Sequence, residues 1–407
     1  MKLDVEGRRL RLNPRDPAFY QDPYPSYGRI LKDCPVVFWE EFERWCFFGH
    51  RQVDTILRSR RFGRSMAQIE GAVTREPILE VDRHSLLDME PPSHTRLRRL
   101  VQGAFIARRI EELRPRIERL CHELIDQIER RHEVDLLATY ATPIPVVVIA
   151  ELLGVPTQMS QQLLDWSHAM VAVYELGPTD EQIVEARRSA DEFVRFLRGY
   201  VERRRRDPRD DLLSQLIAAE EDGDRLTEDE LISTCILLLN AGHEATVNVI
   251  GNGALALLRH PDQLSKWRSR PDLTRSAVEE LLRYDTPLHV FHRWVLEDQV
   301  VHVPSGGELE LPQGTEVSLV LGAANHDPAV FHEPECIDLA RSKNPHLSFG
   351  GGLHYCLGAP LARLELQIAI PILLERLPAL ELDSSAGEPS WKNTYHFRGL
   401  DALWVRP

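Results

Sequence analysis

The sequence lacks a long uninterrupted run of apolar residues. The longest candidates, Ile144–Leu153 and Leu231–Leu239, are much shorter than the roughly 18 residues that a membrane-spanning helix needs. Residues 1–14 are polar and rich in arginine, without the apolar segment that a secretory signal requires. These absences predict a cytoplasmic protein that does not enter a membrane.

The sequence also lacks closely spaced cysteines. Its six cysteines contain no Cys-x-x-Cys pair, and in a chain of 407 residues this argues against a disulfide framework and against a zinc site of finger type. Flavin, dinucleotide and iron–sulfur motifs are missing as well. The cysteines are Cys34, Cys46, Cys121, Cys235, Cys336 and Cys356.

Positive charge is in deficit. The formal net charge is −14, which argues against nucleic acid or an anionic membrane as the main partner. With 43% hydrophobic and 28% charged residues, the chain has the composition of a globular protein that can bury a large core. Internal repeats are not found either, so the sequence does not predict a solenoid or propeller.

Hydrophobic periodicity predicts one large, mainly α domain over residues 1–407, with small β-sheets. Most segments between His94 and Tyr284 carry apolar residues three and four positions apart, as helices do. The charged run Arg203–Asp211 most resembles a linker. A small β tail ends the chain, and β-like runs are expected at Pro35–Trp39, Arg44–Phe48, Leu288–Val303 and Glu308–Leu321.

Two helices have clear local signals. Thr227 and Glu230 form a capping box that opens a helix of about 30 residues, which ends before Pro261. A helix so long and apolar must cross the interior. The second helix begins right after Cys356 and runs to about Leu377, with an interior proline at position 371 that should kink it.

The segment around Cys356 carries the strongest chemical signal. Three glycines at positions 350–352 allow backbone angles and close approach that other residues do not. Cys356 then stands at a helix N-terminus, where free N–H groups and the helix dipole lower the pKa of a thiol. This arrangement suits a thiolate that binds a metal beneath a flat cofactor, although a lone cysteine is more often a buried free thiol.

This segment resembles the haem-binding signature of the cytochrome P450 family. The resemblance implies a P450 fold with haem b between the long helix and the helix that follows the cysteine. It also implies that the Cys356 thiolate is the axial ligand of the iron and donates electron density that favours O–O cleavage. By the same resemblance, His354 contacts a haem propionate. The matching residues are Phe349, Gly350, Gly352, His354, Cys356 and Gly358.

Further family positions occur in the family's order along the chain. Glu280 and Arg283 match the Glu-x-x-Arg pair, whose side chains share a helix face and brace the cofactor loop. His94 and Arg98, four residues apart, match two propionate-binding positions, and Arg293 matches a third. Taken alone, each of these residues is more often an ordinary surface group. They support the resemblance because they occur together and in the same order along the chain as in the family.

The long helix resembles the family's oxygen-binding segment at residues 241–246. Ala241 and Ala245 form a small-residue face that lets the helix approach the haem closely. Gly242 offers a carbonyl that could accept a hydrogen bond from Thr246. Seen alone, the pattern would indicate an apolar buried helix with a solvated polar stripe.

One position departs from the family. Ala245 replaces the threonine whose hydroxyl helps to deliver protons, and Thr246 is about 100° further round the helix. Three hypotheses follow: water held by Glu244, Thr246 and the Gly242 carbonyl relays protons, a substrate hydroxyl or carbonyl fills the gap, or oxygen activation is inefficient. We favour water or substrate assistance.

The resemblance implies insertion of one atom of O2 into a small or medium-sized, largely apolar organic substrate. Electrons would come from a separate ferredoxin and reductase supplied by NAD(P)H, because the chain has no electron-carrier motif of its own. The expected pocket residues are Leu238, Ala241, Val290, Phe291 and His396. Residues that could meet a substrate carboxylate are Arg75, Arg83, His289 and His396.

Two further points stay open at the level of sequence. Arg96, Arg99, Arg108 and Arg109 form either a basic patch for an acidic ferredoxin or an ordinary solvated face. The rival functions are a peroxide-driven peroxygenase and a haem-thiolate sensor without turnover. The peroxygenase ranks lower, because the oxygen helix keeps Glu244 and lacks the arginine expected of that class.

Overall fold

The structure is a computed structural model of the 407-residue chain. It describes residues 1–67, 77–103, 105, 107–175, 177–221, 223–304 and 306–407. Helices dominate, and small sheets accompany them, as the sequence predicts. Within the described ranges, no helix is both long enough and apolar enough to cross a membrane.

The α-helices are distributed along almost the whole chain. Their bounds are α1 Pro17–Tyr20, α2 Tyr24–Asp33, α3 His50–Arg58, α4 Ser93–Gln102, α5 Ala107–Glu112, α6 Arg114–Ile128, α7 Pro143–Leu153, α8 Ser160–Val171, α9 Asp180–Arg206, α10 Leu212–Ala218, α11 Glu228–Arg259, α12 Pro261–Ser269, α13 Thr274–Tyr284, α14 Leu321–Ala324 and α15 Ala359–Arg376. Short helical turns are η1 Glu40–Phe42, η2 Glu80–His84, η3 Leu86–Asp88, η4 Leu137–Ala141, η5 Thr157–Met159, η6 Ala172–Tyr174, η7 Pro271–Leu273, η8 Gly352–His354 and η9 Ser384–Ala386.

The strands form one large sheet and three small ones. The large sheet has the strand order β1-β2-β3-β4-β12-β9-β5, and it joins the N-terminal strands to strands from late in the chain. The strands are β1 Lys2–Asp4, β2 Arg9–Arg11, β3 Val36–Trp39, β4 Arg44–Phe47, β5 Phe62–Gly63, β6 Val134–Asp135, β7 Glu220–Glu221, β8 Asp224–Arg225, β9 Val290–Val295, β10 Gln299–His302, β11 Glu308–Leu311, β12 Glu316–Val320, β13 Glu381–Leu382 and β14 Trp404–Arg406.

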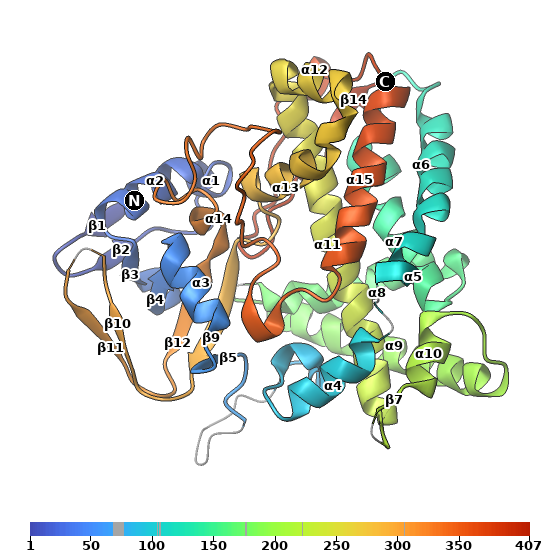
Figure 1. The fold of residues 1–407 in the computed structure, drawn as a ribbon, viewed down its shortest axis with the longest axis horizontal. Coiled ribbons are helices and arrows are strands. Elements are labelled where there is room, and N and C mark those ends of the chain that lie inside the picture. The colour runs from blue at the N-terminus through green and yellow to red at the C-terminus, as the bar shows by residue number, and fades with distance from the viewer. Residues whose placement is uncertain (68–76, 104, 106, 176, 222, 305) are drawn as a thin grey trace.

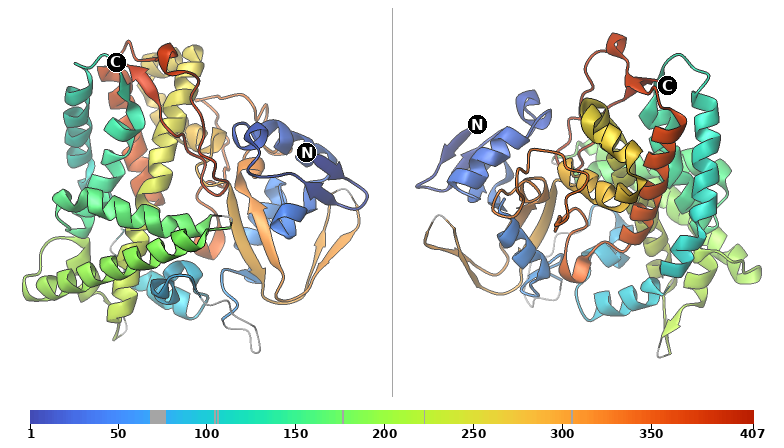
Figure 2. Two further views of the ribbon diagram at one scale, coloured as in Figure 1. Left: turned by 180° about the vertical axis from the view of Figure 1, so that it is seen from behind. Right: turned by 45° about the horizontal axis from the view of Figure 1, so that its top comes forward.

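The large sheet and the helices lie on different sides of the molecule. The sheet lies with α1, α2 and α3 near the N-terminus, whereas α11 and α15 run side by side through the helical part (Figure 1). The largest apolar core surrounds α11 and draws on α6, α7, α9 and α15 (Figure 2). The loop that leads into α15 lies between the sheet and α4, where both parts of the fold meet (Figure 1).

The two helices with clear sequence signals are present. The Thr227 hydroxyl accepts a hydrogen bond from the Glu230 N–H, and the Glu230 carboxylate accepts one from the Thr227 N–H, so the predicted capping box opens α11. The 32 residues of α11 span about 48 Å. Helix α15 has Gly358 as its N-cap and keeps Pro371 in its interior.

The structure adds detail to two expectations about organisation. The two strand-like runs after Leu288 contain four strands, of which β9 and β12 pair in the large sheet while β10 and β11 form a separate hairpin. The charged run Arg203–Asp211 begins in the last turn of α9, and residues 207–211 connect α9 to α10. Arg204 is buried and its Nε donates to Asp211 at 2.6 Å, so that intramolecular pairing compensates the charges.

Candidate active site

The loop around Cys356 is built by glycine. Gly350 and Gly352 have φ values of 69° and 65°, which residues with a side chain rarely adopt. A Cβ at Gly352 would also collide with the backbone of Leu57 and Arg58 at the end of α3. A Cβ at Gly350 would lie 3.0 Å from the Phe291 ring, so β9 packs directly against the loop. The loop therefore presents Cys356 at a fixed place just before α15.

Opposing effects act on the pKa of the Cys356 thiol. Burial raises the pKa of its thiol, whereas the backbone N–H groups of Gly358 and Ala359 and the guanidinium groups of Arg98 and Arg363 lower it. The helix end therefore lowers the pKa of the thiol, as expected, but burial outweighs this effect in the protein alone. The N–H donors nevertheless point at sulfur, and a bound metal cation would stabilise the thiolate that they favour.

Three predicted propionate ligands surround this loop. His94 on α4 is completely buried, and neither ring nitrogen has a hydrogen-bond partner. Arg98, on the same helix, donates from Nη2 to the Tyr355 carbonyl at 2.7 Å, beside Cys356. Arg293 on β9 is 3% exposed, and its Nη1 donates to the carbonyl of His292 at 2.8 Å.

His94 and Arg293 are buried, and the Glu90 carboxylate lies close enough to raise the pKa of both against the larger effect of burial. Burial lowers the pKa of Arg293 to about 9, with a further contribution from the nearby Arg64. Burial and the neighbouring His354 and Arg98 lower the pKa of His94 to about 4. Among the described residues no carboxylate forms an ion pair with Arg293. Because buried donors without acceptors are costly, the cluster fits a group that brings its own carboxylates, as haem does.

His354 has a carboxylate partner that the sequence did not reveal. Its Nε2 lies 3.2 Å from Glu90 Oε1, and its ring centroid lies 4.4 Å from that of His94. Burial lowers the pKa of His354, and Glu90 opposes this shift. Glu90 and His354 are far apart in sequence, and the only local signal for Glu90 was its place before Pro91 and Pro92, ahead of α4.

The Glu-x-x-Arg pair is fully buried on α13. Arg283 donates from Nη2 and Nε to the two carboxylate oxygens of Glu280, at 2.8 and 2.9 Å, and both side chains are 0% exposed. Arg283 also donates to the carbonyls of Asn325, Pro334 and Cys336. Glu280 in turn accepts from Arg341, Asn344 and the Asp338 N–H. The pair thus ties α13 to the segment that precedes the cysteine loop.

Residues 241–246 of α11, which resemble the oxygen-binding segment of the family, include both small and polar side chains. Gly242 packs toward Ile149 of α7, where a Cβ would fit at 3.5 Å, and Thr246 is buried. Within the described residues no hydrogen bond joins Thr246 to the Gly242 carbonyl. Burial would raise the pKa of Glu244, but a hydrogen bond from His168 and the charge of Lys392 lower it to about 2, so this side chain is ionised.

A cavity of about 110 Å³ adjoins the oxygen-side helix. Ala241 and Asn240 of α11 line it, opposite the segment η2–η3, and Phe397 from the C-terminal loop contributes a ring. Tyr174 donates its hydroxyl to Asp82 at 3.0 Å in the same wall. Tyr174 was missed, because nothing in the sequence links it to a residue so far away along the chain.

The other expected pocket residues do not line this cavity. Leu238 packs against the main core, Val290 is buried in the core beneath the large sheet, and Phe291 lies against Gly350. His396 Nε2 lies 2.9 Å from His292 Nε2.

The candidate carboxylate ligands have other neighbours. Arg83 pairs with Glu80, and His289 Nδ1 lies 2.9 Å from the Tyr27 hydroxyl. Arg75 lies outside the described residues.

A cysteine presented by a glycine loop at a helix start, with His94, Arg98 and Arg293 around that loop, is typical of a haem-thiolate protein. Residues 72–393 match the family model for cytochrome P450. Cytochrome P450 107B1 of Saccharopolyspora erythraea is 40% identical over 96% of both chains, and 6-deoxyerythronolide B hydroxylase of the same organism is 37% identical over 96% of this chain and 97% of its own.

The fold agrees with this match. A solved structure of P450BioI in complex with an acyl carrier protein ligated to hexadec-9Z-enoic acid has a TM-score of 0.87 at 36% identity, over 96% of this chain and 99% of that chain. The chain belongs to the cytochrome P450 family. It is therefore a monooxygenase whose cofactor is cysteine-ligated haem b.

A substitution at Arg293 tests whether the buried donor cluster is built for haem. We expect Arg293→Met to raise the thermal unfolding temperature of the haem-free protein, because a buried cation is replaced by an apolar side chain. The same change should speed haem loss about tenfold, because a propionate partner is removed. Thermal unfolding and haem transfer to an excess of a scavenger protein measure the two effects.

Arg44→Met provides the matched control. Arg44 lies in the same sheet on β4, which β12 separates from β9, and it has a carboxylate partner, Glu316, at 2.9 Å. Its loss should lower stability and leave the rate of haem transfer unchanged. Equal effects of both substitutions on haem transfer would show that Arg293 has no special role at the cofactor.

Proposed function

We propose that the protein inserts one atom of O2 into a medium-sized, largely apolar organic molecule, with electrons from a separate ferredoxin and its reductase. The observation that carries this proposal is the convergence on the cysteine loop of Cys356, the unpartnered imidazole of His94 and the buried guanidinium of Arg293. Bound haem would supply the oxygen-activating chemistry. The residues of the chain hold the cofactor, orient the substrate and carry protons.

The roles at the cofactor follow from the contacts. Cys356 provides the thiolate, and the N–H groups at the start of α15 moderate its charge. His94, Arg98 and Arg293 bind the two propionates, and Phe349 packs under the Arg363 guanidinium at 4.4 Å, which holds the loop. Glu280 and Arg283 fix the segment before the loop without touching the substrate.

The cavity wall suggests how a substrate is oriented. Most of its lining is apolar, but Asp82 adds a polar end. Burial and the nearby Asp88 raise the pKa of Asp82 to about 7, although the Tyr174 hydroxyl opposes the shift. Near neutral pH this group both donates and accepts hydrogen bonds, so it favours a hydroxyl or amine on the substrate and disfavours a carboxylate.

Proton supply is proposed to use Glu244 with ordered water. The side chain of Glu244 is 12% exposed, and its carboxylate reaches outward to His168 at 3.5 Å and to Lys392 at 3.3 Å. It therefore links the interior with groups nearer the surface. Ala245 leaves room beside it for a water molecule or for a polar group of the substrate, and Thr246 lies one position on.

Substituting Ala245 by threonine tests this proposal. We expect the ratio of product formed to NAD(P)H consumed to change by less than about twofold with the native substrate, because water or substrate already carries the protons. Peroxide formation is measured in the same assay. A large gain in this ratio for Ala245→Thr would show that wild-type oxygen activation is inefficient and that neither water nor substrate compensates.

The function is tested by reconstitution with a surrogate ferredoxin and reductase. Candidate substrates are first selected by the change they cause in the haem spectrum, and turnover under isotopically labelled O2 should then give products with one labelled oxygen. Because the similar P450BioI was solved with an acyl carrier protein, the library includes carrier-bound acyl chains beside free compounds. Substrate-induced spectral change without any oxygenated product would support a sensor instead.

The proposed docking face for the ferredoxin lies on the side of the molecule where the cofactor loop is exposed. Arg96 is paired with Asp224 and Glu230, and Arg108 lies 3.2 Å from Glu112, so these charges are partly compensated within the chain. Tyr355, next to the ligand cysteine, is 38% exposed and marks where the cofactor loop comes nearest the surface. We propose docking at this side of the molecule, because electron transfer requires a short path.

A further inference from the structure

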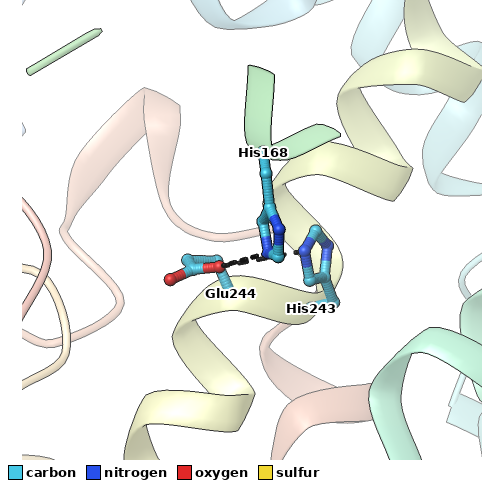
Figure 3. A group of neighbouring side chains, drawn as sticks. All are labelled: His168, His243 and Glu244. Carbon is cyan, nitrogen blue, oxygen red and sulfur yellow. Dashed lines mark ion pairs between the residues drawn. The ribbon is translucent and has the colours of Figure 1, made fainter. Parts of the chain in front are cut away.

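Three side chains with metal-ligand chemistry converge beside the oxygen-side helix. They are His168 from α8 and the adjacent His243 and Glu244 from α11 (Figure 3). The Nε2 atoms of His168 and His243 lie 3.5 and 3.9 Å from Glu244 Oε2. The three donor atoms all lie within 4.8 Å of one another. Two imidazoles and a carboxylate are a donor set that Zn²⁺ uses in proteins.

His243 is prepared as a ligand by its own helix. Its Nδ1 lies 2.9 Å from the carbonyl oxygen of Leu239, and since a carbonyl only accepts, Nδ1 carries the proton. The lone pair is therefore on Nε2. The side chain is 1% exposed, and Nε2 has no hydrogen-bond partner. A buried acceptor left unpaired is costly, and a backbone bond to the opposite nitrogen is the usual way to orient a metal-binding histidine.

The spacing and the access also suit a metal. Tetrahedral zinc with nitrogen and oxygen ligands places neighbouring donor atoms about 3.3 Å apart, so small rotations of the side chains bring the three atoms together. His168 is 57% exposed and can make that adjustment while it leaves an entry path from solvent. The opposite oxygen of Glu244 stays near Lys392, at 3.3 Å.

We propose that His168, His243 and Glu244 form a binding site for a divalent transition metal of the zinc type, with water as the fourth ligand. Lys392 weakens the site, because its ammonium group repels the metal and competes for the carboxylate. A metal bound here would occupy the Glu244 carboxylate, which could then no longer take part in proton transfer. This consequence rests on the proposed function, whereas metal binding does not depend on it.

The test measures Zn²⁺ binding to the full-length, haem-loaded protein after treatment with a chelator. Titration against a fluorescent zinc chelator gives the affinity, and metal analysis after gel filtration gives the stoichiometry. We expect one tight site per chain. His168→Gln and His243→Gln should each weaken binding at least about tenfold, and Lys392→Gln should strengthen it severalfold.

The control is an exposed histidine–carboxylate pair elsewhere. His302 lies 3.3 Å from Glu308 and is 86% exposed, so His302→Gln should leave zinc affinity unchanged. The spectrum of the reduced protein with carbon monoxide shows that each variant has kept its folded haem site. If His243→Gln fails to fold, the exposed His168 still decides the question. Equal affinity of wild type and His168→Gln, or a stronger effect of His302→Gln, would overturn the proposal whatever the turnover assay shows.

Discussion

Cys356→Ser is expected to abolish the strongly red-shifted absorption band that the reduced, carbon monoxide-treated protein shows with thiolate ligation. Monooxygenase turnover should fall to the background of the haem-free protein. The reason is chemical, since a serine hydroxyl is a poor ligand for haem iron and donates far less electron density than a thiolate. The backbone N–H groups of Gly358 and Ala359 would then face a neutral oxygen in place of sulfur.

A second cysteine provides the control for this experiment. Cys336 is free and exposed, and only its backbone carbonyl contacts the Glu280–Arg283 network. Cys336→Ser should keep the red-shifted band and full turnover. If Cys356→Ser retained the band, the ligand would be a different residue, and the proposed assignment of the cofactor loop would have to be abandoned.

Glu280→Gln is expected to have the largest effect on stability. The substitution leaves the fully buried Arg283, together with Arg341, without the carboxylate that both contact. Breaking a buried pair by removal of one partner costs about 3–5 kcal/mol, because the remaining charge is uncompensated. The free energy of unfolding, measured with denaturant, should fall accordingly. Haem content after purification should fall too, since the segment before the cysteine loop loses its anchor.

The matched control has the same residues at the same helical spacing on the surface. Glu185 and Arg188 of α9 form an i,i+3 pair whose side chains are 50% and 58% exposed. Glu185→Gln should leave stability nearly unchanged, because solvent screens exposed pairs. Similar denaturation midpoints for the two variants would mean that the buried Glu280–Arg283 pair contributes no more to stability than the exposed pair.

Sequence reasoning succeeded where the signals are local. The capping box of Thr227 and Glu230 and the glycines before Cys356 act within a few residues, and both features have the expected backbone form. It failed where partners are distant. Strands β9 and β12 belong to the large sheet because β12 pairs with β4, and no short-range pattern records that partnership.

The same limit applies to the candidate site. The motifs identified Cys356 and Arg293, and the structure places Arg293 near enough to the cofactor loop to lower the pKa of His354. Glu90, Tyr174 and His168 escaped notice because each matters only through a contact with a residue far away along the chain. The contribution of the helix end to the pKa of Cys356 could be predicted, but the larger effect of burial could not, since burial is a property of the whole fold.

The pairing of β4 with β12 has a consequence for biosynthesis. Cys46 lies opposite Ser318 in that parallel ladder, so the early strands gain this neighbour only after most of the polypeptide has left the ribosome. Such non-local pairing is slow. Until β12 is available, the unpaired edge of β4 can associate with other nascent chains. Arg293 lies on β9, the strand next to β12, so this part of the haem-binding site forms late in synthesis. Haem binding should therefore follow release of the completed chain.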